Sequence, residues 1–547
     1  MFLISNIRMT QSQKKYLPHF EAILGGALYA AGFPLFGTDF YLCFAPIIGF
    51  YFYFHALLKK ISIRYALLIT LLFSFSMVLT GYYWIPTSLA NFWKINLNTS
   101  LVLSILSPFL ILPHLFIFGF LIPIIIAFLK RKKFKNPGFI NVFICSIFLI
   151  LQYSIPKVFN AYPGHSWIQI SPFLKPAQFF GEYVYTFFSI LIALELATYQ
   201  NSKKINQFNT IFIILFFLIT FFFPITFSNQ TKPLRLKIIQ PNIKNGLLID
   251  PNGYIESIEK TFLKYRELSQ NTQNENIDLI IWPEGSYKRP LSNLTINREI
   301  DFMPKKFIEM VRGNSTPFLL SGFYNDITNN KLLTSNILIS EKKHTQVYSK
   351  NILMPFGEKI PGPPWITTTI KKYLSSPEKY TASNKKLIFQ TTNKFNQPIS
   401  FVSPICYEIL FSEFIRDLMN SNKKLFPDLI INLSNDSWSE NSAEVYQHFL
   451  LTKWRAIEFN KFFIRSTTTG FSAIVDPSGS ELLRSNLLKE EILIQEIHPP
   501  IKPTLTLYQE YGFIPIFVLI LFILIINLIF KKNYFPFSKS LGTPFNK

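Results

Sequence analysis

Cys406 is the cysteine whose surroundings most favour chemistry. Of the three cysteines in the chain, Cys43 and Cys145 lie inside long apolar runs, where a thiol usually serves as a small hydrophobic side chain. Cys406 lies in a polar segment and is followed directly by Tyr407 and Glu408. A thiol becomes a strong nucleophile when a base or a cation favours its thiolate form. The alternative is that Cys406 is a buried and inert residue.

Two other residues follow strand-like runs in the same way as Cys406. Glu284 comes after the apolar run 279–282, and Lys350 comes after the run 346–349. Because functional groups in α/β proteins gather beyond the carboxyl ends of strands, we expect the three side chains to converge. Glu284 would accept the thiol proton, and Lys350 would stabilise the thiolate and later an oxyanion. Taken singly, Glu284 also fits a helix N-terminal charge, and Lys350 fits a solvated lysine.

The composition indicates that these residues belong to a membrane protein. The chain has 547 residues, of which 49% are hydrophobic and 16% are charged, and the charged fraction of globular domains is about 25%. Eight apolar runs approach the bilayer-spanning length of about 20 residues. They lie at roughly 17–36, 40–58, 65–84, 100–129, 138–155, 176–199, 208–228 and 513–530.

Two of these runs contain residues that disturb a straight helix. The first run is the weakest span, because Gly25, Gly26 and Gly32 interrupt it. The fourth run is overlong and contains Pro108, Pro113 and Pro123. Since proline removes a backbone donor, we expect a kink or a tilted entry in the fourth run.

Basic residues cluster in every second segment that connects two apolar runs. They include Lys59 and Lys60, Lys130 to Lys133, Lys203 and Lys204, and Lys531 and Lys532. By the positive-inside rule, both termini are cytoplasmic and the polar segment 229–511 is extracytoplasmic. The net charge of +22 is concentrated in such clusters, which argues against nucleic-acid binding. The first run lacks the cleavage site of a signal peptide.

Segment 229–511 alternates between strand-like and helix-like stretches. We predict strands near 236–240, 277–282, 317–323, 335–340, 399–405, 428–433, 462–467 and 472–476, and helices near 254–269, 300–312 and 444–460. Such alternation is typical of an α/β domain, here of about 280 residues.

The motifs around the three candidate residues resemble the nitrilase superfamily, whose catalytic residues are Glu, Lys and Cys in that chain order. The matching motifs are Trp282-Pro283-Glu284, the run from Lys350 to Glu358, Ile405-Cys406-Tyr407-Glu408 and Asn435-Asp436-Ser437-Trp438. Gln240-Pro241-Asn242-Ile243 opens the domain in the manner of that superfamily.

A domain of this kind placed between a seventh and an eighth span is similar to the apolipoprotein N-acyltransferase family. The resemblance implies a polytopic α-helical membrane domain of about eight transmembrane helices and an α/β nitrilase-like domain with an α-β-β-α sandwich. The expected organisation is a membrane domain with seven helices at 1–228, an extracytoplasmic catalytic domain at 229–511, and a final helix with a cytoplasmic tail at 512–547. The location implied is the bacterial inner membrane.

The membrane part contains weaker signatures and two unusual carboxylates. Gly81-Tyr82-Tyr83-Trp84, Tyr162-Pro163-Gly164 and Gly181-Glu182 are similar to signatures of that family. Glu182 and Glu195 lie in the sixth apolar run, and a carboxylate inside a span is costly enough to suggest a function. Glu195 also suits a side chain that snorkels to the cytoplasmic surface.

The resemblance implies a ping-pong reaction that needs neither a cofactor nor a metal. Cys406 would take an acyl chain from the sn-1 position of a phospholipid, phosphatidylethanolamine by family resemblance, as a thioester. The acceptor would be the free α-amine of a diacylglyceryl-cysteine at the N-terminus of an apolipoprotein, the last step of bacterial lipoprotein maturation. The enzyme is expected to act as a monomer.

Four further residues would support this reaction. Glu358 would support Lys350, and Glu408 would either support the site or serve as a structural carboxylate bonded to loop amides. Tyr407 and Trp438 would shape the acyl pocket, unless they belong to the core.

The chain departs from the family pattern at two places. Ser439-Glu440 replaces the usual Phe-Gly, and Thr468-Thr469 precedes Gly470 in place of two asparagines. The departures affect the expected loop geometry near the substrate and the preferred phospholipid.

Two other functions fit parts of the sequence. A membrane-tethered amidase or nitrilase would use the same three residues and a water molecule, although eight spans exceed the single anchor that it needs. A scaffold or transporter is the alternative without chemistry, but the membrane part shows no repeat pair of the transporter type.

Overall fold

The computed structural model describes most of the chain from Gln11 to Phe535. The described residues are 11–93, 95–132, 136–160, 162–202, 205–225, 231–243, 254–270, 276–292, 316–326, 331–340, 345–360, 362–363, 365, 367–368, 380–439, 441–502, 504–530 and 534–535. The predicted helix at 300–312, as well as Lys133, Lys203, Lys204, Glu440, Lys531 and Lys532, lies outside them.

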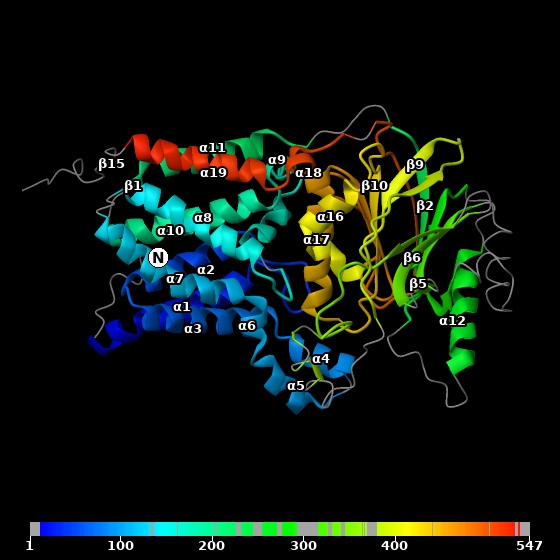
Figure 1. Ribbon diagram of the computed structural model, residues 1–547, viewed down its shortest axis with the longest axis horizontal. Helices are drawn as coiled ribbons and strands as arrows, with labels where there is room; N and C mark the ends of the chain where they lie inside the picture. The colour runs from blue at the N-terminus through cyan, green and yellow to red at the C-terminus, as the bar shows by residue number, and fades with distance from the viewer. Residues whose placement is uncertain are drawn as a thin grey trace, which may run out of the picture. The chain divides into compact units, whose positions relative to one another are not determined.

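The chain divides into a helical unit and an α/β unit (Figure 1). The helical unit comprises residues 1–83, 102–224 and 513–547. The α/β unit comprises residues 225–512 together with 84–101. The short segment 84–101, which lies between the third and fourth apolar runs of the sequence, therefore groups with the α/β unit.

Each of the eight predicted apolar runs overlaps a helix. These helices are α1 (Gln11–Ala30), α2 (Ala45–Leu58), α3 (Ile63–Gly81), α7 (Pro113–Arg131), α8 (Pro137–Ser154), α10 (Tyr183–Ser202), α11 (Gln207–Phe222) and α19 (Ile514–Ile529). Three of the described helices, α3, α7 and α8, are long and apolar enough to cross a membrane. Helices α2, α11 and α19 are apolar but shorter, so the number of spans stays a prediction.

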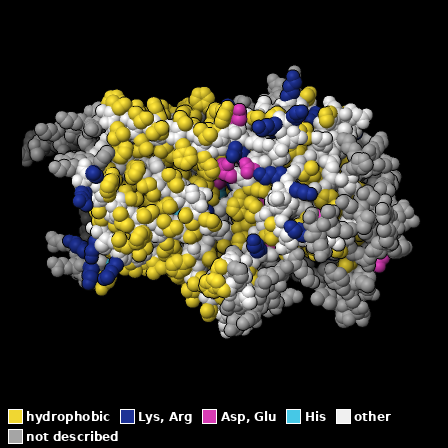
Figure 2. Space-filling model, in the orientation of Figure 1, with side chains coloured by type: hydrophobic (Ala, Val, Ile, Leu, Met, Phe, Trp, Pro, Cys, Tyr) yellow, Lys and Arg dark blue, Asp and Glu magenta, His cyan; other side chains and the backbone are white. Residues whose placement is uncertain are grey.

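Apolar side chains cover the visible face of the helical unit (Figure 2). On α11 and α19, the exposed apolar side chains include Ile214, Leu218, Val518 and Phe522, each of which exposes 45% or more of its surface. A surface this apolar indicates contact with lipid, because soluble proteins rarely expose large contiguous apolar patches.

The glycines of the first apolar run bring helices together. A Cβ atom on Gly25 of α1 would lie 2.7 Å from the carbonyl oxygen of Gly49 on α2, and a Cβ on Gly49 would lie 2.6 Å from that of Gly25. The two backbones are therefore in direct contact, as small residues allow in membrane helices. These glycines serve packing between helices, although they weaken the apolar run as a sequence signal.

The fourth apolar run, for which the sequence predicts a kink or a tilted entry, is divided into separate helices near its prolines. Helix α5 (Leu97–Ser104) is followed by α6 (Ser107–Ile111) and then by α7. Pro108 lies in the first turn of α6 and Pro113 in that of α7, where the missing backbone N–H costs no hydrogen bond.

The two carboxylates of the sixth run have partners inside the helical unit. Glu195 Oε1 accepts hydrogen bonds from Asn141 Nδ2 at 3.0 Å and from Asn209 Nδ2 at 2.6 Å. Asn209 Oδ1 in turn accepts from Asn527 Nδ2 at 2.9 Å. Glu195 thus joins helices α8, α10, α11 and α19, which differs from the snorkelling alternative. Glu182 Oε2 lies 2.5 Å from His165 Nε2, and both side chains are buried.

The α/β unit contains two main sheets. The first has the order β14-β2-β3-β5-β6-β7, with β4 paired to β5, and the second has the order β13-β12-β11-β10-β9-β8. Their strands are β2 (Leu234–Gln240), β3 (Leu279–Ile281), β4 (Tyr287–Leu291), β5 (Phe318–Asp326), β6 (Lys331–Ile339), β7 (Gln346–Ser349), β8 (Phe389–Thr392), β9 (Pro398–Val402), β10 (Leu429–Ser434), β11 (Phe462–Thr467), β12 (Ala473–Val475), β13 (Glu481–Arg484) and β14 (Glu491–Ile497).

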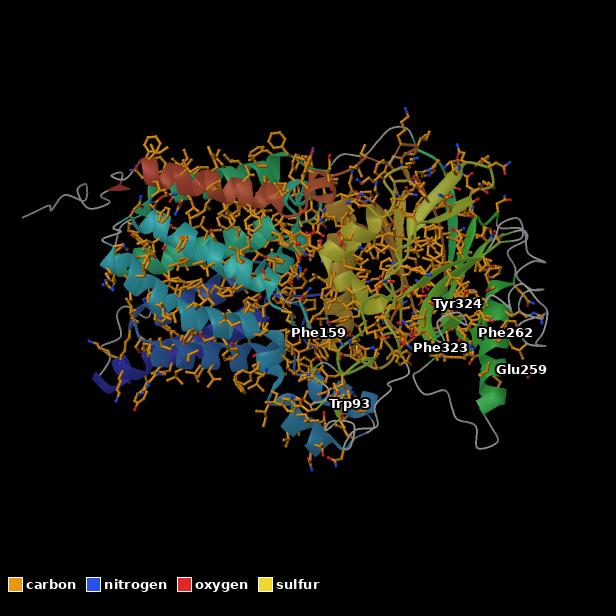
Figure 3. All side chains as sticks on the ribbon, in the orientation of Figure 1. Trp93, Phe159, Glu259, Phe262, Phe323 and Tyr324 are labelled. Atoms are coloured by element: carbon orange, nitrogen blue, oxygen red, sulfur yellow. The ribbon has the colours of Figure 1, made fainter. Side chains whose placement is uncertain are left out.

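Helices cover the outer face of each sheet. Helix α12 (Tyr254–Ser269) packs on the first sheet, and α17 (Ala443–Phe459) packs on the second (Figure 1). Figure 3 labels Phe262 on α12 and Tyr324 on β5, and both belong to the core between helix and sheet. Strand β10 is buried along its whole length, which is typical of parallel strands covered on both faces. The predicted α/β domain is confirmed.

Buried hydrogen bonds join the inner faces of the two sheets. Asn336 Nδ2 on β6 donates to Ser403 Oγ, just beyond β9, at 2.8 Å. Gln240 Oε1 at the end of β2 accepts from Ser472 Oγ at 2.7 Å. Since buried polar groups are costly unless they are paired, these bonds fix how one sheet lies on the other.

Candidate active site

Glu284 and Lys350 come from the same sheet and meet at the ends of its strands. Glu284 lies three residues beyond β3, in a turn that leads to β4, and no helix begins there. Lys350 directly follows β7 and is 2% exposed. The distance from Lys350 Nζ to Glu284 Oε1 is 3.4 Å. Neither a helix N-terminal charge nor a solvated lysine describes this pair.

Glu358 is the nearer carboxylate to the lysine. Its Oε1 lies 2.7 Å from Lys350 Nζ, and its Oε2 accepts a hydrogen bond from the backbone N–H of Met354 at 2.8 Å. The Glu358 carboxylate therefore binds the Lys350 ammonium and also stabilises the turn between Met354 and Glu358. Charge-assisted bonds of this length are the strong ones, so Glu358 holds Lys350 in place.

Cys406 comes from the second sheet and lies at a sharp turn. Ile405 still pairs with Leu433 of β10 in a parallel bridge, and Cys406 then opens the 3₁₀ helix η2 (Cys406–Leu410). The φ angle of Cys406 is +47°, a conformation that L residues rarely adopt outside functional sites. Glu284 and Lys350, which come from the first sheet, both act on the ionisation of the thiol.

The charges of the site determine its resting protonation state. Burial raises the pKa of the Cys406 thiol, the charge of Glu284 raises it further, and that of Lys350 opposes both. Burial also raises the pKa of Glu284, which Lys350 counteracts. For Lys350, burial favours the neutral form, but the charges of Glu284 and Glu358 raise the pKa well above its usual value. These shifts favour the charged form of Lys350 and the protonated form of Cys406.

Glu408 links the two halves of the site. Its carboxylate accepts backbone N–H bonds from Asn351 at 2.6 Å and from Ile352 at 3.1 Å, directly after Lys350. It also accepts from the N–H of Ile405 at 2.8 Å, directly before Cys406, and from Tyr348 Oη at 2.8 Å. Burial raises the pKa of Glu408 to about 7, while these donors stabilise its charged form. Of the two roles that the sequence allows for Glu408, this geometry agrees with a structural carboxylate bonded to loop amides.

The two predicted pocket aromatics have different surroundings. Tyr407 is buried, and its ring centroid lies 5.2 Å from that of Phe411. Trp438 is half-buried, and its ring centroid lies 6.3 Å from that of Trp84. Their role in an acyl pocket stays a prediction.

A buried ionic cluster behind Cys406 was not predicted from the sequence. Asp436 Oδ2 lies 2.8 Å from Arg465 Nη2, and Asp436 Oδ1 lies 3.5 Å from His448 Nδ1. Although burial opposes ionisation, Arg465 holds the pKa of Asp436 well below its usual value. The charge of Asp436 in turn acts on Cys406. The available signal was Arg465 itself, a charged residue within the otherwise uncharged strand β11.

One departure from the family pattern contacts the same loop. Thr468 Oγ1 donates to Asn435 Oδ1 at 2.6 Å, and Asn435 opens the motif that contains Asp436 and Trp438. Ser439, at the other departure, donates from its backbone N–H to the carbonyl oxygen of Asp436 at 3.2 Å. One departure therefore lies on the loop that contains Asp436, and the other contacts that loop from the end of β11.

The described residues contain no cluster of three or more His, Cys, Asp or Glu side chains that could hold a metal ion. What the site can do chemically is covalent catalysis: a thiol, a carboxylate able to accept its proton, and a fixed cation able to stabilise negative charge.

The sequence of this chain is similar to those of known proteins. The carbon-nitrogen hydrolase family model matches residues 236–501. Apolipoprotein N-acyltransferase 2 of Treponema denticola is 26% identical over 545 residues, which cover 95% of this chain and 98% of that protein. The apolipoprotein N-acyltransferase of Haemophilus influenzae is 26% identical over 541 residues, with 94% and 95% covered. That of Wigglesworthia glossinidia brevipalpis is 28% identical over 480 residues, with 82% and 87% covered.

Proposed function

Since the chain belongs to the apolipoprotein N-acyltransferase family, we propose that it transfers a fatty acyl chain from a phospholipid to the N-terminal α-amine of apolipoproteins. The product is the mature, N-acylated lipoprotein. The observation that carries the mechanism is the placement of the Lys350 ammonium, 3.4 Å from the Glu284 carboxylate and close enough to the Cys406 thiol to act on its pKa.

The first half-reaction loads Cys406. Glu284 removes the thiol proton as the sulfur attacks the carbonyl carbon of the sn-1 ester, and Lys350 stabilises the resulting oxyanion. Collapse of the tetrahedral intermediate breaks the ester C–O bond and leaves a thioester on Cys406. Glu284 returns the proton to the departing alkoxide, and a lysophospholipid leaves.

The second half-reaction restores the thiol. The α-amine of a diacylglyceryl-cysteine attacks the thioester carbon, and Glu284 accepts a proton from the nitrogen. The C–N bond forms, the C–S bond breaks, and the proton returns to the sulfur of Cys406. A general-base role for Glu284 agrees with a thiol that burial keeps protonated. The two half-reactions share one site, so the kinetics are ping-pong.

The chain is a membrane protein with several apolar helices. Extraction of an acyl chain from a bilayer costs about 0.8 kcal/mol per CH₂ group, and a site held at the membrane avoids that cost. We place the enzyme in the bacterial inner membrane as a monomer with about eight spans. Its α/β domain faces the periplasm and both termini face the cytoplasm, in accordance with the distribution of basic residues. Phosphatidylethanolamine is the proposed donor.

Acyl transfer by the purified full-length protein tests the proposal. The protein in detergent is mixed with a phospholipid labelled in its sn-1 chain and with a diacylglyceryl peptide, and mass spectrometry follows the label. We expect label on the peptide amine, and on Cys406 when the acceptor is omitted. Cys406→Ala should abolish both, whereas Cys145→Ala, which changes a cysteine of helix α8, should retain both.

Two outcomes would contradict the proposal. Normal transfer by Cys406→Ala would exclude the thioester. Release of free fatty acid or of ammonia from simple amides, without transfer to the peptide, would instead favour a hydrolase.

A further inference from the structure

The segment 84–101 contacts the turn that supports the catalytic lysine. Helix α4 (Ile85–Trp93) ends at Trp93, which is labelled in Figure 3. The indole Nε1–H of Trp93 donates a hydrogen bond of 2.7 Å to the carbonyl oxygen of Phe356, and the two ring centroids lie 6.4 Å apart. Trp93 precedes this partner by 263 residues, and both belong to the α/β unit.

The turn that receives this bond is compact and strained. Glu358 N–H donates to the carbonyl oxygen of Met354 at 2.8 Å, and Phe356 N–H donates to that of Lys359 at 2.8 Å. Phe356 itself has a φ angle of +61°, which a bulky L residue adopts only when its surroundings impose it. The indole donor fixes the carbonyl of this strained residue.

The same turn delivers Glu358 to Lys350. Glu358 follows Phe356 by two residues, and its two oxygens bind Lys350 Nζ at 2.7 Å and Met354 N–H at 2.8 Å. Among the residues that the structure describes, Lys350 is the cation whose charge lowers the pKa of Cys406. A continuous series of contacts therefore leads from Trp93 through Phe356 and Glu358 to the ammonium that stabilises the thiolate.

We propose that Trp93 is a positioning residue for Lys350, because its indole N–H fixes the turn at 354–359 from which Glu358 holds the catalytic ammonium. The inference rests on the proposed role of Lys350 and Cys406. Segment 84–101 would then contribute to catalysis, although it lies between two apolar runs of the sequence.

The test is the pH dependence of Cys406 alkylation in the full-length protein. Iodoacetamide is uncharged and reacts with the thiolate, and mass spectrometry of the Cys406 peptide separates its modification from that of Cys43 and Cys145. Trp93→Phe keeps an aromatic ring and removes the donor. Because Lys350 lowers the pKa of the thiol, a displaced Lys350 should move the alkylation midpoint to higher pH. At a fixed pH below the midpoint, the rate should fall about three- to tenfold.

A double-mutant comparison shows whether Trp93 acts through the lysine. Lys350→Met should also raise the midpoint, and Trp93→Phe should add nothing in the Lys350→Met background. Trp84→Phe is the matched control: it removes an indole N–H of the same segment, whose partner Gln447 Oε1 lies outside the turn at 354–359. Its midpoint should remain that of the unchanged protein.

The results separate the role of Trp93 from the proposed catalytic site. An unchanged midpoint in Trp93→Phe, or an equal shift in the Lys350→Met background, would overturn the role of Trp93 alone. An unchanged midpoint in Lys350→Met would instead overturn the proposed catalytic site. If Trp93→Phe does not fold, benzothienylalanine at position 93 keeps the bicyclic shape, replaces the N–H with sulfur, and carries the same expectations.

Discussion

Lys350 Nζ lies 2.7 Å from Glu358 Oε1 and therefore has a closer partner than Glu284, whose Oε1 is 3.4 Å away. The two carboxylates differ in consequence. Glu358 is occupied by the ammonium and by the Met354 N–H, which leaves Glu284 as the carboxylate that can exchange a proton with Cys406. In the proposed mechanism, Lys350 thus separates the base, Glu284, from a carboxylate that only holds the lysine, Glu358.

The first prediction concerns the strength of this contact. Glu358→Gln replaces the charged acceptor of Lys350 with a neutral one, and a hydrogen bond to a charged group contributes about 1.5–3 kcal/mol. We expect kcat for acyl transfer to fall roughly 10- to 100-fold. Asp417→Asn is the control, because Asp417 meets Lys386 at 3.2 Å but is half exposed, and its loss should leave kcat unchanged. An equal loss in both variants would contradict the prediction.

The second prediction concerns the pH profile of the same variant. A base must lose its proton before it can act, so kcat/KM should rise with pH through the pKa of Glu284, which burial raises and the charge of Glu358 raises further. Glu358→Gln removes that negative charge and lowers the pKa of Glu284. The acidic limb of kcat/KM should therefore move to lower pH, even though the maximal rate falls. A limb that stays in place would show that Glu284 is not the titrating base, whereas an upward shift would show that Lys350, whose charge lowers the pKa of Glu284, has moved away from it.

The third prediction concerns Glu408. Four donors converge on its carboxylate, and the amide of Gln would direct N–H groups at some of them. Glu408→Gln should lower the free energy of unfolding by on the order of 3 kcal/mol and reduce acyl transfer, as measured by thermal denaturation and product formation in detergent. Glu413→Gln, at a partly exposed ion pair with Arg416, should change stability by less than about 1 kcal/mol. Equal stability of the two variants would count against a linking role for Glu408.

The fourth prediction concerns Gly470. A Cβ atom at this position would lie 2.2 Å from Asp436 Oδ2, so Gly470→Ala must displace the carboxylate from Arg465. Disruption of a buried ion pair costs about 3–5 kcal/mol, and we expect a loss of about 3 kcal/mol in the free energy of unfolding. In an Asp436→Ala background the methyl group has room, and Gly470→Ala should cost little. Additive losses in the double variant would refute the steric explanation.

The sequence indicates site residues best where a reactive side chain comes shortly after a strand. Lys350 immediately follows β7, and Glu284 lies three residues beyond β3, so the ends of apolar runs gave the candidates, and the resemblance of their motifs to the nitrilase superfamily selected them. The sequence indicated Glu358 only through that resemblance. These relationships are local, and local patterns survive in a single sequence.

Other parts of the structure depend on contacts between distant residues. Trp93 binds a carbonyl 263 residues away, and Arg465 binds Asp436 from the neighbouring strand, which no periodicity of the sequence specifies. The glycines of α1 gave a misleading signal for a related reason. They weaken the helix as an isolated segment, but their small size is what lets α1 contact α2. The sequence predicts the elements, and tertiary contacts determine their partners.

The bond between Asn209 and Asn527 has a consequence for biosynthesis. The two residues are separated by 318 positions, and nearly the entire α/β unit is encoded between them. Asn209 therefore gains this partner only when almost the whole chain has been synthesised. Helix α19 is the last of the described helices that can join α11, and a chain that ends before α19 lacks this bond.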